Sequence, residues 1–284
     1  MRVHLCGVRG STPAPGAEFV RYGGHTSCVA IAPDGGAPRL ILDAGTGLRQ
    51  VTGLLGGTPF AGTIILTHLH WDHVHGLPFF AAGDRHDARV ALLLPEQEEA
   101  GQEEGSADAE EVLARGMSPP HFPIRPSGLR GEWSFCSLAP GVFKAEGFTV
   151  EAREVPHKGG RTFGYRVSDG HSAIAYIPDH CPTALGPGPE GWGEYHPAAL
   201  GLAAGVDLLI HDSFLLPDEV AAEASFGHPA ADYAVGLARR ARARHVLLTH
   251  HKPDRTDDAL DALATRFRPD PRVTIAAQGQ LIDL

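Results

Sequence analysis

Cysteine is scarce in this chain of 284 residues, and its four cysteines are scattered without a CxxC pair. The opening stretch, MRVHLCGVRG, is too short and too polar for a signal peptide. In a chain without an export signal, scattered cysteines are expected to be reduced thiols, so we expect a cytoplasmic protein. The cysteines are Cys6, Cys28, Cys136 and Cys181.

Long apolar runs and basic runs are also absent. No apolar run approaches the roughly 18 residues that a membrane span needs, so we expect no membrane partner. The net charge is −10, and no Lys/Arg run marks a nucleic-acid footprint, although a local basic patch would still be compatible with the sequence. Composition therefore leaves nucleic acid undecided, and it leaves a homodimer open.

Nucleotide-binding fingerprints are missing too. GVRGS (7–11) lacks both the GxGxxG pattern and the Walker lysine, so it predicts a tight turn beside a pocket. A contact of Arg9, Ser11 or Thr12 with a phosphate is the alternative. No linker and no internal repeat divides the chain, and 43% hydrophobic residues suffice for a sizeable core. We therefore expect one domain over residues 1–284.

Short apolar runs bounded by Gly, Pro or Asp predict β-strands. These runs span 2–8, 27–32, 39–45, 62–68, 89–95, 148–154, 162–167, 172–179, 207–213, 245–251 and 272–277. Helical patterns span 45–55, 97–116, 228–243 and 256–267. In the third helix, Pro229 suits the first helical position and the arginines come last. Strands in two groups, mixed with helices, predict an α/β protein with more than one sheet. The Pro/Gly-rich segments 117–131 and 181–198 read as surface loops, which can also form pocket walls.

Histidine is unusually frequent in this chain, at 17 residues. The segment THLHWDH (67–73) places three histidines directly after an apolar run. Histidine is the commonest metal ligand. His68 and His70 alternate, so they would face one side of a continuing strand and could grip one cation. Asp72 and His73 follow where the chain turns and could grip a second. His75 lies outside this pattern and is expected to face solvent or start a helix.

Further ligand-type residues follow other predicted strands. His157 comes after EAREVP, Asp179 after SAIAYIP, and His250 after HVLLT. An aspartate between two cations can bridge them, because each carboxylate oxygen binds one. The recurrence of an apolar run followed by a ligand-type residue predicts a two-metal site.

The motifs that carry these residues resemble those of the metallo-β-lactamase superfamily. They are LDAGTGL (42–48), THLHWDH (67–73), VPHKGG (155–160), YIPDH (176–180), IHDSF (210–214), GHPAADYA (227–234) and LLTHHKP (247–253). Within the superfamily, GVRGSTPAPG (7–16), YGGHTSC (22–28) and MSPPHFPI (117–124) resemble a bacterial subgroup that groups with phosphodiesterases. Those are tRNase Z, the phosphoribosyl cyclic phosphodiesterase and class II-like cyclic-nucleotide phosphodiesterases. The resemblance covers nearly the whole chain.

The resemblance implies a four-layer αβ/βα sandwich with its site at one edge of the two sheets. It implies that one metal takes His68, His70 and His157, that the second takes Asp72, His73 and His250, and that Asp179 bridges them. It also implies a catalytic, non-ligand role for His228, paired with Asp212. This chain reads GHPA where tRNase Z reads HSTA, and it lacks an obvious basic, glycine-rich arm, so a tRNA substrate is less expected.

Several neighbours of these residues leave choices open. His251 is the alternative to His250 as the last ligand. Cys181 is interpreted as structural, and His180 as a loop or substrate-side residue. Asp43 is expected to accept a hydrogen bond from a ligand imidazole, with a helix cap as the alternative. In HKGGR (157–161), Lys158 and Arg161 would suit an anionic substrate, or else they are solvated surface charges.

The expected function is a hydrolase with two divalent ions, Zn²⁺ or else Mn²⁺ or Fe²⁺, in which a metal-bridging hydroxide attacks a small anionic phosphodiester. Asp72 could also steer the proton of the nucleophile. A lactone or thioester hydrolase would need the same ligands and is the first alternative. A tRNA 3′-processing endonuclease is the second. A protein that binds metal without turnover is the third.

Overall fold

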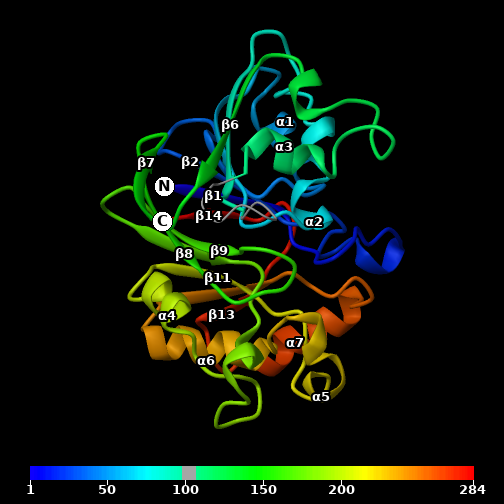
Figure 1. Ribbon diagram of the computed structural model, residues 1–284. Coiled ribbons are helices and arrows are strands. Elements are labelled where there is room, and N and C mark those ends of the chain that lie inside the picture. The colour runs from blue at the N-terminus through cyan, green and yellow to red at the C-terminus, as the bar shows by residue number, and fades with distance from the viewer. Residues whose placement is uncertain (98–106) are drawn as a thin grey trace.

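Two seven-stranded β-sheets face each other in the computed structural model, which describes residues 1–97 and 107–284 (Figure 1). The first sheet has the order β14-β1-β2-β3-β4-β5-β6. Its strands are β1 (Arg2–Gly7), β2 (Cys28–Ala32), β3 (Leu40–Leu42), β4 (Ala61–Ile65), β5 (Arg89–Pro95), β6 (Glu132–Leu138) and β14 (Leu281–Asp283). Strands β3 to β6 run parallel to one another, whereas β1 and β2 pair antiparallel with their neighbours.

The second sheet has the order β13-β12-β11-β10-β9-β8-β7. Its strands are β7 (Gly141–Ala145), β8 (Phe148–Glu154), β9 (Phe163–Ser168), β10 (Ala173–Ile177), β11 (Leu208–Asp212), β12 (His245–Thr249) and β13 (Val273–Ile275). Strands β10 to β13 are parallel, and β7 to β10 are antiparallel. The carboxyl ends of β10, β11 and β12 therefore meet at one edge of this sheet.

Helices cover the outer faces of both sheets. The α-helices in the described residues are α1 (Leu48–Leu54), α2 (Trp71–Val74), α3 (Ala109–Ala114), α4 (Pro197–Ala203), α5 (Val220–Glu223), α6 (Ala231–Ala241) and α7 (Asp257–Phe267). Short 3-10 helices span Ala17–Phe19, Leu77–Phe79, Pro126–Gly128, Pro182–Leu185 and Ala224–Phe226. Helices α1 and α3 pack on the first sheet, and α4, α6 and α7 pack on the second (Figure 1).

Three apolar layers hold this arrangement together. The central layer lies between the sheets and includes Val29, Val150 and Ile174, while the two outer layers lie between each sheet and its helices. Strand β8 alternates buried and half-exposed residues along most of its length, and β10 is buried throughout. A strand buried on both faces reads as a continuous apolar run, which is why AIAYI could be recognised in the sequence. The predicted four-layer α/β sandwich is confirmed.

The helix predictions differ from the structure mainly at their starts. Helix α1 begins at Leu48 rather than at residue 45, because Gly45 and Gly47 lie against the backbone of neighbouring segments. Helix α6 begins at Ala231 after an extended Ala230, so Pro229 precedes the helix and the prediction that it occupies the first position was wrong. Helix α7 is confirmed, with the Thr256 hydroxyl accepting from the Ala259 amide. Of the predicted helix 97–116, residues 98–106 lie outside the described residues, and only Ala109–Ala114 of the remainder form a helix, α3.

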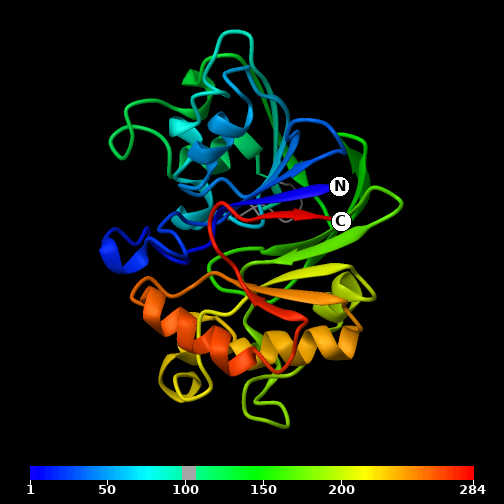
Figure 2. The same ribbon diagram turned by 180° about the vertical axis from the view of Figure 1, so that it is seen from behind.

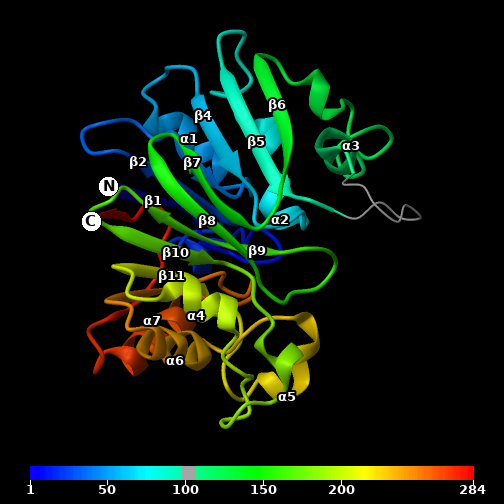
Figure 3. The same ribbon diagram turned by 60° about the vertical axis from the view of Figure 1, so that its left-hand side comes forward.

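Three strands had no sequence signal strong enough to be predicted, and each of them lies at or next to an edge. Strand β6 closes the first sheet, β7 closes the second, and β14 pairs only with β1. Edge strands expose one side of their backbone and need fewer buried apolar residues than central strands. Figure 3 shows β6 beside β5 at the outer end of the first sheet.

The two chain ends lie side by side. Strands β1 and β14 pair antiparallel, and the Leu284 amide donates to the Met1 carbonyl at 3.0 Å (Figure 2). Within residues 1–97 and 107–284, no helix has the length and apolar character to cross a membrane. The expectation that residues 1–284 form one domain stays a prediction.

Candidate metal centre

The seven residues predicted as ligands converge at one edge of the two sheets, although they come from separate segments of the chain. His68, His70, Asp72 and His73 follow β4 and run into α2, His157 follows β8, Asp179 follows β10, and His250 follows β12. Because β10 and β12 run parallel on either side of β11, their carboxyl ends meet at the same edge. We call these seven residues the His/Asp cluster.

One half of the cluster consists of His68, His70 and His157, whose ligand-type atoms lie within 4.8 Å of one another. The Nε2 atom of His157 lies 3.3 Å from the Nδ1 atom of His70. The opposite nitrogen of His157, Nδ1, donates to the carbonyl of Gly227 at 3.0 Å. Because a carbonyl only accepts, this contact places the proton on Nδ1 and leaves Nε2 free to bind a cation.

The other half consists of Asp72, His73 and His250. The Nε2 atom of His250 lies 3.1 Å from the Asp72 carboxylate and 3.4 Å from Nε2 of His73. His250 has a left-handed backbone, with φ of 58°, which is rare for a residue other than glycine. Its ring packs against Gly10, where a Cβ atom would lie only 2.4 Å from Nδ1. The turn predicted around Gly10 therefore seats this imidazole.

Asp179 lies between the two halves with one carboxylate oxygen toward each. Its Oδ1 atom is 3.4 Å from His157, while its Oδ2 atom is 2.8 Å from His73 and 3.3 Å from His250. The side chain is almost fully buried. This is the arrangement expected of a carboxylate shared by two cations.

Asp43 fixes the orientation of His73 from the side opposite the cluster. Its Oδ2 atom accepts from Nδ1 of His73 at 2.8 Å, and the carboxylate also accepts from the hydroxyls of Thr67 and Tyr176. Asp43 is therefore the acceptor for a ligand imidazole that the sequence predicted. The alternative of a helix cap was wrong, because Gly47 occupies the cap position of α1.

The donor set fits divalent cations on observations made within the protein itself. The buried Nε2 atom of His68 has no hydrogen-bond partner among the described residues, and Oδ2 of Asp179 makes no hydrogen bond of good geometry although it lies 2.8 Å from His73. Burying such atoms without a partner is costly, so a ligand for them is expected. Imidazole nitrogens with carboxylate oxygens suit zinc and also manganese or iron.

The pKa shifts within the cluster also favour cation binding. Burial and neighbouring imidazoles hold the pKa of His68 well below its usual range, so its ring is neutral. Burial alone would raise the pKa of Asp179, but the surrounding histidines outweigh it and hold the pKa well below the usual range. Burial by itself would lower the pKa of His250. The carboxylates of Asp179 and Asp72 outweigh burial and raise this pKa to about 9. Without a cation, a proton on His250 offsets the carboxylate charge that a metal would otherwise balance.

His228 and Asp212 form a pair beside the cluster. Nδ1 of His228 donates to Oδ2 of Asp212 at 2.9 Å, and the imidazole stacks on Phe214 with ring centres 4.3 Å apart. Asp212 also accepts from the amides of His180 and Phe214. These contacts hold His228 in one orientation beside a cavity of about 750 Å³ that opens over the cluster, which we call the metal cavity.

The structure separates His250 from its alternative. His251 is buried with its Nε2 atom 2.8 Å from the Ala276 carbonyl, away from the cluster, and burial lowers its pKa to about 3. The expectation that His180 is a loop or substrate-side residue was wrong, because its fully buried ring lies against His211. Cys181 is buried beside Thr183 and belongs to none of the potential ligand groups in the described residues.

The cations expected near a phosphate are engaged elsewhere. Arg9 is fully buried and donates to the carbonyls of Gly23 and Arg255, so a phosphate contact for it was a wrong alternative. Arg161 pairs with Glu96 and Glu154, and Lys158 bonds the carbonyl of Ser225. Arg9 therefore acts as a structural group, whereas Arg161 is a partly exposed ion-pair residue and Lys158 is an exposed cation.

Two contacts of the site were not predicted from the sequence. The backbone amide of Ser11 donates to Oδ2 of Asp72 at 2.7 Å, and the Gly227 carbonyl orients His157. Backbone groups carry no side-chain signal, so residue patterns cannot reveal them. His75 faces solvent, as expected, and its ring stacks on the exposed Trp71 at the rim of the metal cavity.

Comparison with known proteins identifies the family and the fold. Residues 38–251 match the model of the beta-lactamase superfamily domain. Ribonuclease Z of Salinibacter ruber is 26% identical over 272 residues, covering 80% of this chain and 79% of the relative. The metallo-beta-lactamase fold protein YhfI of Bacillus subtilis superposes with a TM-score of 0.70 at 20% identity, over 99% of both chains. The short form of human tRNase Z superposes with a TM-score of 0.67 at 20% identity, over 100% of this chain and 99% of the other.

The matched range contains the whole His/Asp cluster, because it begins before Asp43 and ends after His250. The cluster can hold divalent metal at the sheet edge, with an imidazole–carboxylate pair beside it. The chain therefore belongs to the metallo-β-lactamase superfamily and is a metal-dependent hydrolase of that fold.

Proposed function

We propose that the protein is a dinuclear metal-dependent phosphodiesterase that acts on a small anionic diester. The observation that carries this proposal is the hydrogen bond between His228 and Asp212 beside the His/Asp cluster. Both side chains also lie within reach of Asp179 and His250 as a potential ligand group, but Nδ1 of His228 is engaged by Asp212. Hydrolysis of a phosphodiester expels an alkoxide or phenoxide, which benefits from a proton donor at this place. Net charge of −10 makes a small substrate more compatible with the protein than a large polyanion.

The seven proposed ligands divide by position into two groups of three and one shared aspartate. His68, His70 and His157 would hold one ion, and Asp72, His73 and His250 would hold the other. Asp179 would bridge the two, because its two oxygens face the two different histidine groups. Zinc suits this nitrogen-rich set, and manganese or iron are the alternatives.

When bound, the two ions would lower the pKa of a water molecule and polarise an oxygen of the substrate. Asp72 would accept a proton from the attacking water, while the Ser11 amide holds one of its oxygens in place. When His228 is an imidazolium, its Nδ1–H group donates to Asp212 and its Nε2–H group can donate its proton to the leaving oxygen. Phe214 covers one face of that ring and fixes its direction.

A panel of substrates tests this reaction class. The metal-loaded protein is assayed with bis(p-nitrophenyl) phosphate, an acyl-homoserine lactone and an acyl thioester, and its metal content is measured in the same preparation. Preferential hydrolysis of the diester supports the proposal. A lactone or thioester preference would assign the carbonyl chemistry that the same ligands can perform. Stable metal without turnover of any panel member would indicate a binding protein.

The second candidate is tRNA 3′ processing, which is favoured by the name of the Salinibacter relative, ribonuclease Z. Against it, this chain reads GHPA at 227–230 and has no obvious basic, glycine-rich arm. Cleavage of a precursor tRNA by the metal-loaded protein is the direct check. The cytoplasmic location, and a homodimer, stay predictions.

A further inference from the structure

A second cavity adjoins the metal cavity and is not used by the mechanism above. Its volume is about 820 Å³, which is within the range of small-molecule sites. Leu69 and Trp71 line both cavities, so the two spaces meet at these side chains. We call the second space the aromatic cavity. A ligand held at the His/Asp cluster can therefore extend into it past Trp71.

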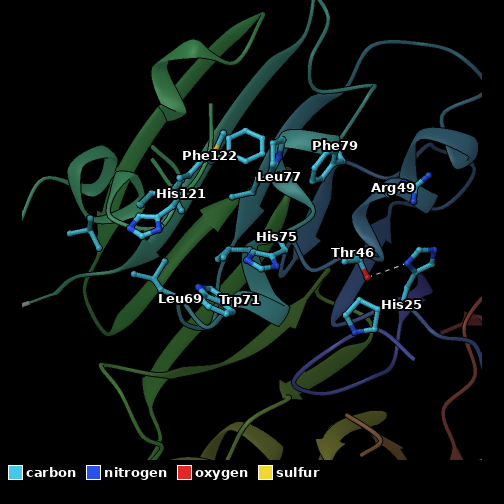
Figure 4. A pocket seen from close by; sticks show the side chains of 17 residues that line it. His25, Thr46, Arg49, Leu69, Trp71, His75, Leu77, Phe79, His121 and Phe122 are labelled. Carbon is cyan, nitrogen blue, oxygen red and sulfur yellow. Dashed lines mark hydrogen bonds between the residues drawn. The ribbon is translucent and has the colours of Figure 1, made fainter. Parts of the chain in front are cut away.

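The walls of the aromatic cavity are flat and apolar. Trp71 is 70% exposed and stacks on His75 with ring centres 5.4 Å apart and planes 20° from parallel. Phe79, which is 58% exposed, meets Phe122 edge to face. Figure 4 shows Phe79 and Phe122 on one side of the cavity and Trp71 with His75 on the other. Large exposed aromatic rings are costly in water unless a ligand covers them, and they suit a planar ring system.

One end of the aromatic cavity is polar. Thr46 and His25 are hydrogen-bonded to each other there, and the exposed Arg49 lies beside them (Figure 4). Among the residues that the structure describes, Arg49 forms no ion pair. Hydrogen-bonding groups at the end of an aromatic slot can satisfy the polar edge of a heterocycle, which a purely aliphatic ligand does not offer.

The position of His228 decides which part of a diester would enter. His228 and Asp212 come from the second half of the chain, whereas every residue that lines the aromatic cavity lies between 13 and 122. The leaving oxygen must face His228 to receive its proton. Since His228 lines the metal cavity but not the aromatic cavity, the retained ester group is the part of the diester that can project past Trp71.

We infer that the aromatic cavity holds the base of a nucleotide diester, on the ester group that is retained when the leaving group departs beside His228. This inference rests on the proposed phosphodiesterase function and names its substrate class. In the reaction, water supplies the oxygen of the new P–O bond, the bond to the leaving oxygen breaks, and a nucleoside monophosphate is released.

Two diesters with the same leaving group test the inference, namely the p-nitrophenyl ester of thymidine 5′-monophosphate and methyl p-nitrophenyl phosphate. We expect kcat/KM to be at least about tenfold higher for the thymidine ester, because stacking one base on an aromatic side chain contributes a factor of that order. In Gly116→Phe this preference should fall toward one, while hydrolysis of the methyl ester is retained. Gly116 lines the cavity and has room for a side chain, since a Cβ atom added there would lie 4.0 Å from its nearest neighbour, the Leu113 carbonyl oxygen.

Gly53→Phe is the matched control. Gly53 lies on α1, outside the aromatic cavity, and an added Cβ there meets nothing within 4 Å. The control should keep the native preference. Equal rates for both esters in the native protein, or a preference that survives in Gly116→Phe, would overturn the cavity assignment and leave the phosphodiesterase proposal standing.

If neither ester is hydrolysed, the phosphodiesterase proposal is wrong. Calorimetry then tests the base site separately. Thymidine 5′-monophosphate and methyl phosphate are then titrated into the metal-loaded protein. At least about tenfold tighter binding of the nucleotide, lost in Gly116→Phe and kept in Gly53→Phe, would keep the cavity as a base site. Equal binding of both phosphates would overturn it.

Discussion

Nδ1 of His73 lies 2.8 Å from Oδ2 of Asp43, on the side of the imidazole opposite the His/Asp cluster. Asp43 is fully buried and has a left-handed backbone with φ of 62°. Thr67 contributes both its amide and its hydroxyl to the same carboxylate, and Tyr176 contributes its hydroxyl. A chain of contacts from both sheets thus decides which nitrogen of His73 faces the metal site.

Asp43→Asn is therefore expected to weaken metal binding, although the side chain at position 43 touches no proposed metal position. Asparagine tolerates the left-handed backbone, so the turn should survive. The loss should be about 10- to 100-fold in metal affinity, as for other groups that orient a ligand imidazole. Competition with a chromophoric chelator measures it. Asp207→Asn is the control, since Asp207 contacts the Ala173 amide and Arg244 rather than a proposed ligand; equal losses in both variants would contradict the assigned role of Asp43.

His228→Ala should slow hydrolysis of a diester with an alkoxide leaving group, such as a dinucleoside monophosphate, by about 10² to 10⁴-fold, the range for removal of a general acid. The metal content should stay at the native level, because Nδ1 of His228 is hydrogen-bonded to Asp212 and only approaches the cluster, at 3.6 Å from Asp179. His250→Ala should instead lower the metal content. Elemental analysis beside steady-state kinetics distinguishes the two. Metal loss in His228→Ala, or full metal in His250→Ala, would mean that ligand and catalyst have been interchanged.

Metal binding should release protons and strengthen as pH rises from about 6 toward about 9. The pKa of His250 is raised to about 9 in the metal-free protein, where burial is outweighed by Asp179 and Asp72, so the ring is protonated at neutral pH and a metal must displace that proton. Calorimetric zinc titrations in buffers of different ionisation enthalpy count the released protons. An affinity that stays constant over this pH range would contradict the raised pKa.

The same shift has a consequence for the metal-free fold. A group whose pKa is raised on folding stabilises the protein at pH values below its unfolded pKa, and this contribution is lost as pH rises through the folded value. The free energy of unfolding of the metal-free protein should therefore fall as pH approaches the His250 pKa of about 9. Urea unfolding at several pH values checks this, with the metal-loaded protein as the control that lacks the decline.

Arg9→Met should destabilise the protein by about 3–5 kcal/mol, as expected when one partner of a buried charged network is removed. The guanidinium is fully buried, donates to the carbonyls of Gly23 and Arg255, and lies 3.8 Å from the buried Asp257. Arg89→Met is the matched control, because Arg89 is 79% exposed and its ion pair with Glu132 spans 3.6 Å. It should cost no more than about 1 kcal/mol. Chemical denaturation of both variants gives the comparison.

The sequence by itself determined the layers and the residue types of the site. Apolar runs such as AIAYI (173–177) are long enough to mark buried strands, and THLHWDH places four ligand-type residues where one such run ends. These signals are local, because a strand buried on both faces needs apolar residues throughout and a turn at its end leaves polar side chains at the sheet edge. Edge strands β6, β7 and β14 lacked such signals for the converse reason.

Only the tertiary structure decided how those residues meet. His250 and His251 are adjacent and of one type, yet the left-handed backbone at His250 directs one ring into the cluster and leaves the other against Ala276. Arg9 reads as a cation beside a pocket, but the carbonyls of segments distant in sequence enclose it. The aromatic cavity likewise forms between α2, α3 and the segment up to Phe122. Such outcomes depend on which backbone groups lie nearby after folding, and residue order alone does not encode those contacts.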